Sequence, residues 1–142
     1  NLLILTRNHS IEYLLYFFTI TISTDVFAFV TGRLVGRCQL IGKISPNKTV
    51  EGLIGGTIMG TIIPVVFYTT VIDSSISLQV LCLVTISLSL ISQLGDLVFS
   101  SIKRHFNVKD FSNLIPGHGG ILDRFDSIIF VILGAILFLG II

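Results

Sequence analysis

Four long apolar stretches constrain this chain more than any other feature of its sequence. Only 12% of its 142 residues are charged, which is about half the share that is usual in soluble domains. Each stretch comes close to the roughly 20 residues that a helix needs to cross a bilayer. The sequence therefore predicts an all-α, polytopic integral membrane helix bundle with about four transmembrane helices. The stretches run from about Ile11 to Thr31, Leu53 to Ile72, Ile76 to Phe99 and Ser127 to Ile142.

Residues 1–142 are expected to form a single transmembrane domain, because no soluble insert or repeat interrupts the apolar stretches. The first residue is Asn1 and no cleavable leader pattern follows it, so we expect the C-terminal part of a longer chain. Pro64 predicts a kink in the second stretch. Cys38 and Cys82 are far apart and lack metal-site spacing, which disfavours a disulfide or a metal role for them.

The basic residues predict how the chain is oriented. Two apolar stretches separate the two basic segments, so the segments should emerge on the same side, and positively charged loops stay cytoplasmic. Asp73-Ser74-Ser75, a predicted hairpin between the two middle stretches, contains no Lys or Arg. A formal net charge of +1 gives no indication of a nucleic-acid partner. Eight of the nine basic residues form the two segments: Arg33, Arg37, Lys43 and Lys48 in the first, and Lys103, Arg104, Lys109 and Arg124 in the second.

A polar stripe runs along the third apolar stretch. Its members recur at spacings of three or four residues and so share one face of a helix. Hydrogen bonds between helices would explain Thr85 and Ser89. They explain Asp96 poorly, because an ionised carboxylate inside a membrane needs a cation partner, and we therefore predict a functional role for Asp96. The stripe consists of Thr85, Ser89, Gln93, Asp96, Ser100 and Lys103.

The second basic segment also contains glycines and two carboxylates. The glycines of Pro116-Gly117-His118-Gly119-Gly120 let backbone N–H groups approach an anion, and the helix that follows could bind a phosphate at its N-terminus. Asp123 and Asp126 share a face if that helix has already begun. Such carboxylates beside basic residues suit Mg²⁺ carrying a nucleoside triphosphate. The alternative is a solvated loop in which one of the two Asp residues caps the helix.

The first basic segment permits two interpretations. Asp25, Gly32 and Gly36 fall near one helical face, where small residues allow close helix packing. Pro46 is expected to end the preceding helix, and Lys48 can reach a phosphate as a point charge. Ordinary positive-inside topology explains the same residues equally well.

Two runs of residues with fixed spacing cover both basic segments and parts of three apolar stretches. The upstream run is Asp25-x2-Ala28-Phe29-x2-Gly32-x3-Gly36-Arg37 and Ile44-Ser45-Pro46-x-Lys48-Thr49-x-Glu51-Gly52-x2-Gly55-Gly56. The downstream run is Ser100-x-Ile102-Lys103-Arg104-x4-Lys109-Asp110-x-Ser112-x2-Ile115-Pro116-x-His118-Gly119-Gly120-Ile121-x-Asp123-Arg124-Phe125-Asp126. Together these runs resemble the signature of the CDP-diacylglycerol synthase (phosphatidate cytidylyltransferase) family. Phe29 is a departure, because the family pattern has Tyr there, and it puts in doubt any hydrogen bond from that position.

The resemblance implies an enzyme that transfers a cytidylyl group from CTP to phosphatidic acid, giving CDP-diacylglycerol and pyrophosphate in phospholipid biosynthesis. It implies that Asp96 and Asp123 hold Mg²⁺, and it leaves open a second cation such as K⁺. The implied setting is the lipid bilayer of a bacterial inner membrane, with the site on the cytosolic face, no nucleic acid, and a homodimer left open. The further catalytic residues implied are Lys103, Arg104, Lys109 and Asp126. The substrate-binding residues implied are Ser45, Lys48, Ser100, Asp110, His118, Gly119, Gly120 and Arg124.

Three other functions fit parts of the sequence. An intramembrane aspartyl protease needs a GxGD motif, but Gln93 occupies its first glycine position. A CDP-alcohol phosphotransferase needs a DGxxAR run, which the sequence lacks. A cation transporter using Asp25, Asp96 and Asp123 would place carboxylates near the bilayer midplane, whereas most of the charge lies at the predicted cytosolic edge. A transporter should also ignore CTP.

Overall fold

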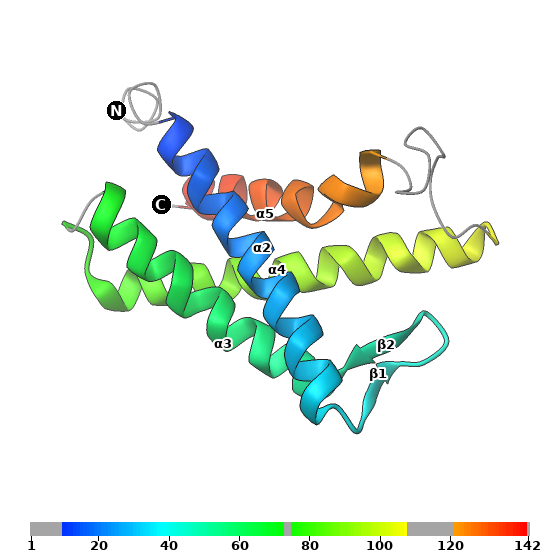
Figure 1. Ribbon diagram of the computed structural model, residues 1–142. Helices are drawn as coiled ribbons and strands as arrows, with labels where there is room; N and C mark the ends of the chain where they lie inside the picture. Colours follow the sequence, from blue (N-terminus) through cyan, green and yellow to red (C-terminus); the bar gives the residue numbers. More distant parts are fainter. Residues whose placement is uncertain (1–9, 73–74, 108–120, 142) are drawn as a thin grey trace.

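The computed structural model describes residues 10–72, 75–107 and 121–141 of the chain, with side chains for 11–72, 75–107 and 126–138. Long helices account for most of these residues, and a small antiparallel hairpin connects the first two (Figure 1). This arrangement confirms the predicted all-α membrane bundle. The elements are α2 (Ser10–Val35), β1 (Gln39–Ile41), β2 (Ser45–Thr49), α3 (Val50–Phe67), the π-helical turn η1 (Tyr68–Ile72), α4 (Leu78–His105) and α5 (Ile121–Ile141).

Three helices of the described residues are long and apolar enough to cross a membrane: Ile11–Val35, Val50–Ile72 and Leu78–His105. They correspond to the first three predicted stretches. In α5 the apolar part found among these residues, Asp126–Phe138, is shorter than any of the three. The structure therefore shows three candidate spans where the sequence predicted about four.

The helix ends differ from the predicted ones. α4 continues past Phe99 to His105 and carries three basic residues in its last turn, where they interact favourably with the negative end of the helix dipole. Asn107 follows in the left-handed region, with φ of 55°, a conformation that commonly terminates helices. α5 already begins at Ile121 rather than at Ser127. The polar residues that follow the third apolar stretch and those that precede the fourth are therefore helical.

A seam of small residues joins α2 to α3. A Cβ added to Gly52 would lie 2.6 Å from the carbonyl oxygen of Ala28, and one added to Gly56 would lie 2.7 Å from the Ala28 Cβ. A Cβ on Gly32 would lie 3.7 Å from the Gly52 Cα. Glycines four residues apart let two helix backbones approach closely within a membrane. The close packing predicted around Gly32 is confirmed, and this seam fixes α2 against α3.

Hydrogen bonds and an apolar cluster hold α4 against α2. Thr85 shares a hydrogen bond of 2.7 Å with the hydroxyl of Tyr16, and Ser89 shares one of 2.9 Å with Thr24. These contacts confirm that the Thr85 and Ser89 part of the polar stripe serves helix packing. The buried apolar cluster around them consists of Tyr16, Ile20, Val65, Tyr68, Leu81, Leu88, Val131 and Ala135.

The part of the first basic segment that contains Lys43 and Lys48 folds into the β1–β2 hairpin, which was not predicted from the sequence. Its strands are antiparallel, with Gln39 opposite Thr49. Pro46 lies within β2, and the expectation that it ends the preceding helix is wrong, because α2 has already ended at Val35. A two-stranded sheet has only edge strands, which tolerate a residue without an N–H group.

Two further predictions concern the end of α3. Pro64 lies inside this helix, and the N–H of Tyr68 bonds to the carbonyl oxygens of Pro64 and Val65 as the helix passes into η1. The kink at Pro64 stays a prediction. In the predicted hairpin, Asp73 and Ser74 lie outside the described residues.

Candidate active site

A cavity of about 450 Å³ lies where α2, α3, α4, α5 and the β1–β2 hairpin meet. Three carboxylates from three different helices line it: Asp25 of α2, Asp96 of α4 and Asp126 of α5. Lys48 of β2 is the basic residue of this lining. Residues far apart in the sequence thus combine three acidic groups and one ammonium group around one space. The other lining residues are Ala28, Phe29, Leu40, Ser45, Asn47, Thr49, Gly52, Leu53, Gln93, Leu97 and Ser127.

Asp96 has the cation partner that its position in an apolar helix requires. The ammonium group of Lys48 donates a hydrogen bond to Oδ2 of Asp96 and forms an ion pair with it. The Lys48 and Asp96 side chains are 28% and 32% exposed, so the pair lies at the surface of the cavity rather than deep in the protein. The first basic segment therefore contributes directly to the surroundings of Asp96.

The backbone beside Lys48 is held firmly to the start of α3. Thr49 caps this helix, because its side-chain oxygen accepts a hydrogen bond of 3.1 Å from the Gly52 N–H. The next residue, Val50, donates its N–H to the carbonyl oxygen of Cys38 at 3.0 Å. An N-cap of this kind is typically worth about 1 kcal/mol. These bonds fix the hairpin end so that the Lys48 side chain reaches α4.

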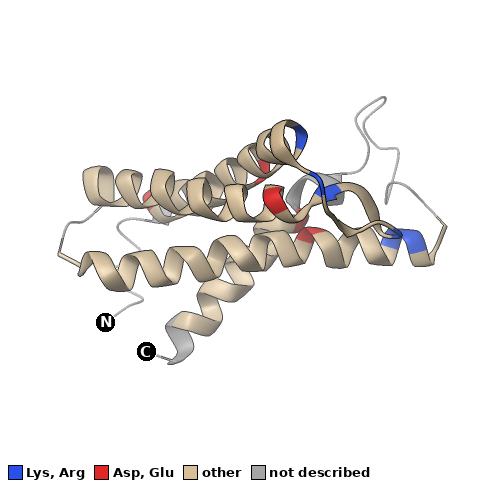
Figure 2. Cartoon of the chain, turned by 90° about the horizontal axis from the view of Figure 1, so that it is seen from below, with Lys and Arg blue, Asp and Glu red and all other residues tan. Residues whose placement is uncertain are grey.

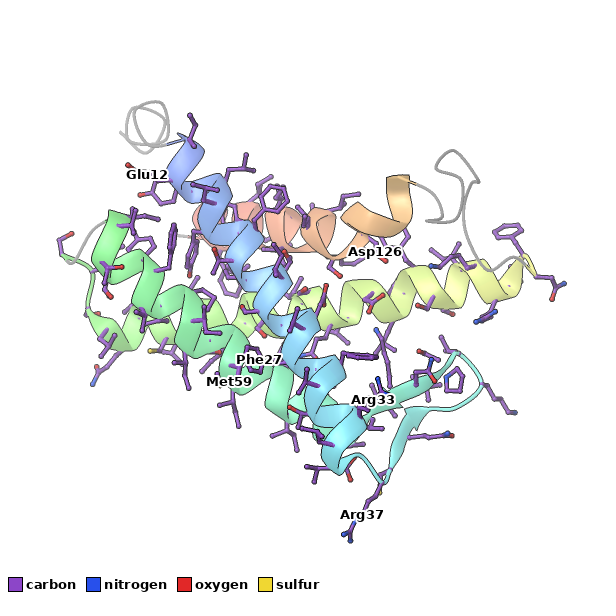
Figure 3. The ribbon with its side chains drawn as sticks, viewed as in Figure 1. Glu12, Phe27, Arg33, Arg37, Met59 and Asp126 are labelled. Atoms are coloured by element: carbon purple, nitrogen blue, oxygen red, sulfur yellow. The ribbon has the colours of Figure 1, made fainter. Side chains whose placement is uncertain are left out.

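Asp126 lies between α5 and α4 (Figure 3) and is only 6% exposed. Its carboxylate accepts a hydrogen bond of 2.6 Å from the N–H of Ser127. Because α5 begins at Ile121, Asp126 is well inside the helix, and the alternative in which Asp126 caps the helix is wrong. Asp126 instead contributes a buried carboxylate to the cavity.

Asp25 was not among the predicted site residues, although it lines the cavity. It interacts electrostatically with Asp96, Lys48 and Asp126. One signal in the sequence could have identified it: Asp25 is a carboxylate inside an apolar span, and such residues are usually functional. Asp96 was identified on that ground, whereas Asp25 was named in the helix-packing face, in the family motif and in the transporter alternative, but was not assigned to the site.

Gln93 links α4 to α3 beside the cavity. Its side-chain NH₂ group donates to the Thr57 hydroxyl at 3.0 Å and to the Leu53 carbonyl oxygen at 3.3 Å. Gln93 belongs to the polar stripe between Ser89 and Asp96. The stripe therefore changes from helix packing at one end to cavity lining at the other.

The structure places the predicted site residues unevenly. Ser45, Lys48, Asp96 and Asp126 line the cavity, whereas Ser100, Lys103 and Arg104 lie on the following turns of α4, outside its lining. Lys103 nevertheless acts electrostatically on Asp126. Asp123 and Arg124 fall within α5, but their side chains are not described. The predicted residues that lie wholly outside the described ranges are Lys109, Asp110, His118, Gly119 and Gly120.

The described Lys and Arg residues of the two basic segments gather at one end of the molecule. Figure 2 shows them at the end of α2, on the hairpin and at the end of α4. Acidic residues lie beside them in the same region (Figure 2). This arrangement supports the prediction that the two segments emerge on the same side, next to the cavity.

The oxygen donors of the cavity suit a divalent cation that is bound together with a phosphate ligand. Among the described side chains, those of residues 11–72, 75–107 and 126–138, no three His, Cys, Asp or Glu residues are grouped closely enough to hold a metal. Mg²⁺, however, is usually bound by one or two carboxylates and takes its remaining ligands from substrate phosphates and water. Asp96, Asp126 and Asp25 offer oxygen donors to the same cavity. The residues therefore fit Mg²⁺ carried by a phosphate-bearing substrate.

Comparison with known proteins identifies the family of the chain. A phosphatidate cytidylyltransferase of Staphylococcus haemolyticus (strain JCSC1435) is 52% identical over 127 residues, which are 89% of this chain and 48% of the relative. Enzymes of the same name from Staphylococcus saprophyticus (strain ATCC 15305) and Staphylococcus aureus (strain COL) are 51% and 49% identical with the same coverage. The chain thus spans about half the length of the curated relatives it matches. The profile of the cytidylyltransferase family matches residues 1–142, and the chain belongs to that family.

Proposed function

We propose that this chain forms the catalytic site of a phosphatidate cytidylyltransferase. The enzyme would transfer a cytidylyl group from CTP to phosphatidic acid and release pyrophosphate. The family match and the names of the relatives support the proposal. The structural observation that carries it is the cavity in which Asp25, Asp96 and Asp126 meet Lys48, at the basic end of an apolar helix bundle. A cavity with charged residues at the end of an apolar bundle suits a triphosphate and a lipid headgroup as substrates.

The reaction needs little covalent chemistry from the protein. A phosphate oxygen of phosphatidic acid attacks the α-phosphorus of CTP, and a new P–O bond forms. The bond from the α-phosphorus to the bridging oxygen breaks, and pyrophosphate leaves with that electron pair. The attacking oxygen is already anionic, so no side chain has to act as a nucleophile. Catalysis then consists of positioning the two substrates and neutralising their charge.

Mg²⁺ bound with CTP would supply much of that neutralisation. Asp96 is the first residue that we assign to hold it, together with Asp123 as the resemblance implies. Asp25 and Asp126 line the same cavity and offer further carboxyl oxygens to it. The second cation, such as K⁺, stays a prediction without assigned residues. The basic residues assigned to offset phosphate charge are Lys48, Lys103, Arg104, Lys109 and Arg124.

The lipid substrate is expected to approach from the bilayer. Phe29, Leu40 and Leu97 give the cavity apolar walls, and the Phe29 side chain is 63% exposed on α2. Acyl chains can lie against such a surface while the headgroup phosphate reaches the charged residues. We place the site on the cytosolic face of a bacterial inner membrane because of the positive-inside rule and the bacterial relatives. A homodimer stays a prediction.

An assay on the full-length protein in detergent tests the proposal. Labelled CTP, phosphatidic acid and Mg²⁺ are supplied together, and the label extracted into organic solvent is measured. Lipid-soluble label should form only when all three are present, and excess unlabelled CTP should suppress it much better than ATP or GTP. Label that stays in water under every condition would contradict the proposal.

A further inference from the structure

The Lys48–Asp96 ion pair shares its cavity with two further carboxyl groups. Asp25 and Asp126 line the same cavity as Asp96, so the described side chains of the lining provide three carboxyl groups and one ammonium group. Lys48 bonds to Oδ2 of Asp96. Lys48 pairs with Asp96, so the carboxyl oxygens of Asp25 and Asp126 remain beside it as further donors to a cation in the same cavity.

The Lys48–Asp96 ion pair is weak enough for the lysine to exchange Asp96 for another anionic partner. Ion pairs between partly exposed side chains are worth little, commonly about 1 kcal/mol or less, and each member of this pair is about one-third exposed. The backbone beside Lys48 is fixed by the Thr49 cap on Gly52. The lysine side chain itself is a flexible four-carbon stem with a point charge at its end. Its ammonium group can therefore change partners without any movement of the hairpin.

We infer that Lys48 is an exchangeable counter-ion: it neutralises Asp96 in the absence of substrate and pairs with the triphosphate when CTP binds with its metal. The inference rests on the proposed function and deepens it. While an ammonium group holds Oδ2 of Asp96, this carboxylate is a poorer ligand for a metal. The phosphates of CTP offer Lys48 a new partner and so release Asp96. Lys48 thus makes metal binding depend on the nucleotide.

The two roles of Lys48 predict that removing its charge strengthens metal binding but weakens CTP binding. Lys48→Met keeps most of the stem and removes the charge, so Asp96 loses its competing cation. Metal alone should then bind about twofold to tenfold more tightly, in line with the small worth of such pairs. CTP in the presence of saturating metal should bind about tenfold or more weakly, because a charge-assisted contact is lost. A purely structural ion pair would weaken both kinds of binding.

Lys48→Arg gives a second test that does not depend on removing the charge. A guanidinium group can hold a carboxylate through two parallel hydrogen bonds, so it should release Asp96 less readily. Metal affinity without nucleotide should therefore be highest in Lys48→Met, intermediate in wild type and lowest in Lys48→Arg. Lys43→Met is the matched control, because Lys43 belongs to the same hairpin and is exposed, but it does not line the cavity.

The experiment uses the full-length protein in detergent and Mn²⁺ as the probe for the divalent site. Free Mn²⁺ is measured by its electron paramagnetic resonance signal, first alone and then with CTP. The ranking above, with Lys43→Met equal to wild type, is the expected result. Metal affinity that is unchanged or weaker in Lys48→Met, or stronger in Lys48→Arg than in wild type, overturns the inference. Should wild-type protein fail to bind CTP, the proposed function would be contradicted, while the metal-only ranking would still decide the role of Lys48.

Discussion

Lys48 of the hairpin forms an ion pair with Asp96 of α4 across 48 positions of sequence. The contact ties the first basic segment to the polar stripe of the third apolar stretch. Topology alone could explain the first basic segment, and helix packing alone could explain the polar stripe. The ion pair shows that residues of both line one cavity. The predictions that follow test this cavity, the helix packing that supports it and the orientation of its basic end.

Replacement of Asp96 by Asn should abolish most of the activity. Asn is nearly isosteric with Asp but removes the charge that holds a cation. We expect kcat to fall by about 10²–10³-fold, as for the loss of one strong electrostatic contact at a reacting phosphate. The measurement is the rate of lipid-soluble product formation at saturating CTP and Mg²⁺.

Glu12→Gln is the control for the Asp96 variant, because it makes the same chemical change near the start of α2, away from the cavity (Figure 3). It should leave kcat unchanged. An Asp96→Asn protein with normal activity at low Mg²⁺ would show that the carboxylate does not serve the metal. The polar stripe would then be explained by helix packing alone.

Asp123 should behave as one unit with Asp96. Asp123→Asn should lower kcat about as much as Asp96→Asn, and the double variant should be little worse than either, because residues that act together are not additive. The rates of the two single variants and the double variant form the test. Multiplicative losses, with the double variant about 10⁴-fold or more below wild type, would mean that the two carboxylates act independently.

The seam between α2 and α3 predicts a loss of stability for Gly56→Val. Any Cβ at this position would lie 2.7 Å from the Ala28 Cβ and 2.8 Å from the Thr24 carbonyl oxygen, so the helices must move apart. Overpacking of this kind commonly costs about 1–3 kcal/mol, and the melting temperature in detergent should fall by several degrees. Ile58 lies on the same helix and its side chain is 53% exposed, so Ile58→Val should leave the melting temperature nearly unchanged. An equal melting temperature for Gly56→Val and wild type would show that the seam is not tightly packed.

Orientation can be tested with a thiol that the protein already has. Cys38 is exposed beside the hairpin, and the positive-inside rule places it in the cytosol. In intact cells, membrane-impermeant maleimide should leave Cys38 unlabelled until the membrane is opened. A Ser74→Cys thiol, introduced after Cys38 and Cys82 have been replaced, should react with the same reagent from outside. The reverse labelling pattern would place the basic end outside the cell.

The apolar helices are predictable from the sequence because lipid imposes one strong rule on every spanning segment. Long apolar runs must be helical in a membrane to satisfy their backbone groups. The first three stretches are therefore found as helices almost where they were expected. The helix ends were missed, because past Phe99 the chain becomes polar and no rule of hydropathy says that α4 continues to His105.

The candidate site was predictable only in part. A carboxylate in an apolar helix indicates a function, and Asp96 was identified on this ground, as Asp25 could equally have been. The identity of the partner of Asp96 depends on the three-dimensional path of the hairpin, since nothing in the local sequence connects Lys48 to Asp96. The β1–β2 strands are short and carry no strong alternation of apolar residues, so the pattern did not reveal them.

The central claim is that the cavity transfers the cytidylyl group of CTP to a lipid. The most direct test follows the α- and the γ-phosphate of CTP separately. The full-length protein is given phosphatidic acid, Mg²⁺ and CTP labelled with ³²P at either the α- or the γ-position. Attack on the α-phosphorus predicts that α-label appears in the lipid phase and that γ-label leaves as water-soluble pyrophosphate in equal amount. Transfer of γ-label to lipid, or transfer of neither label, would contradict the account of this cavity as a cytidylyltransferase site.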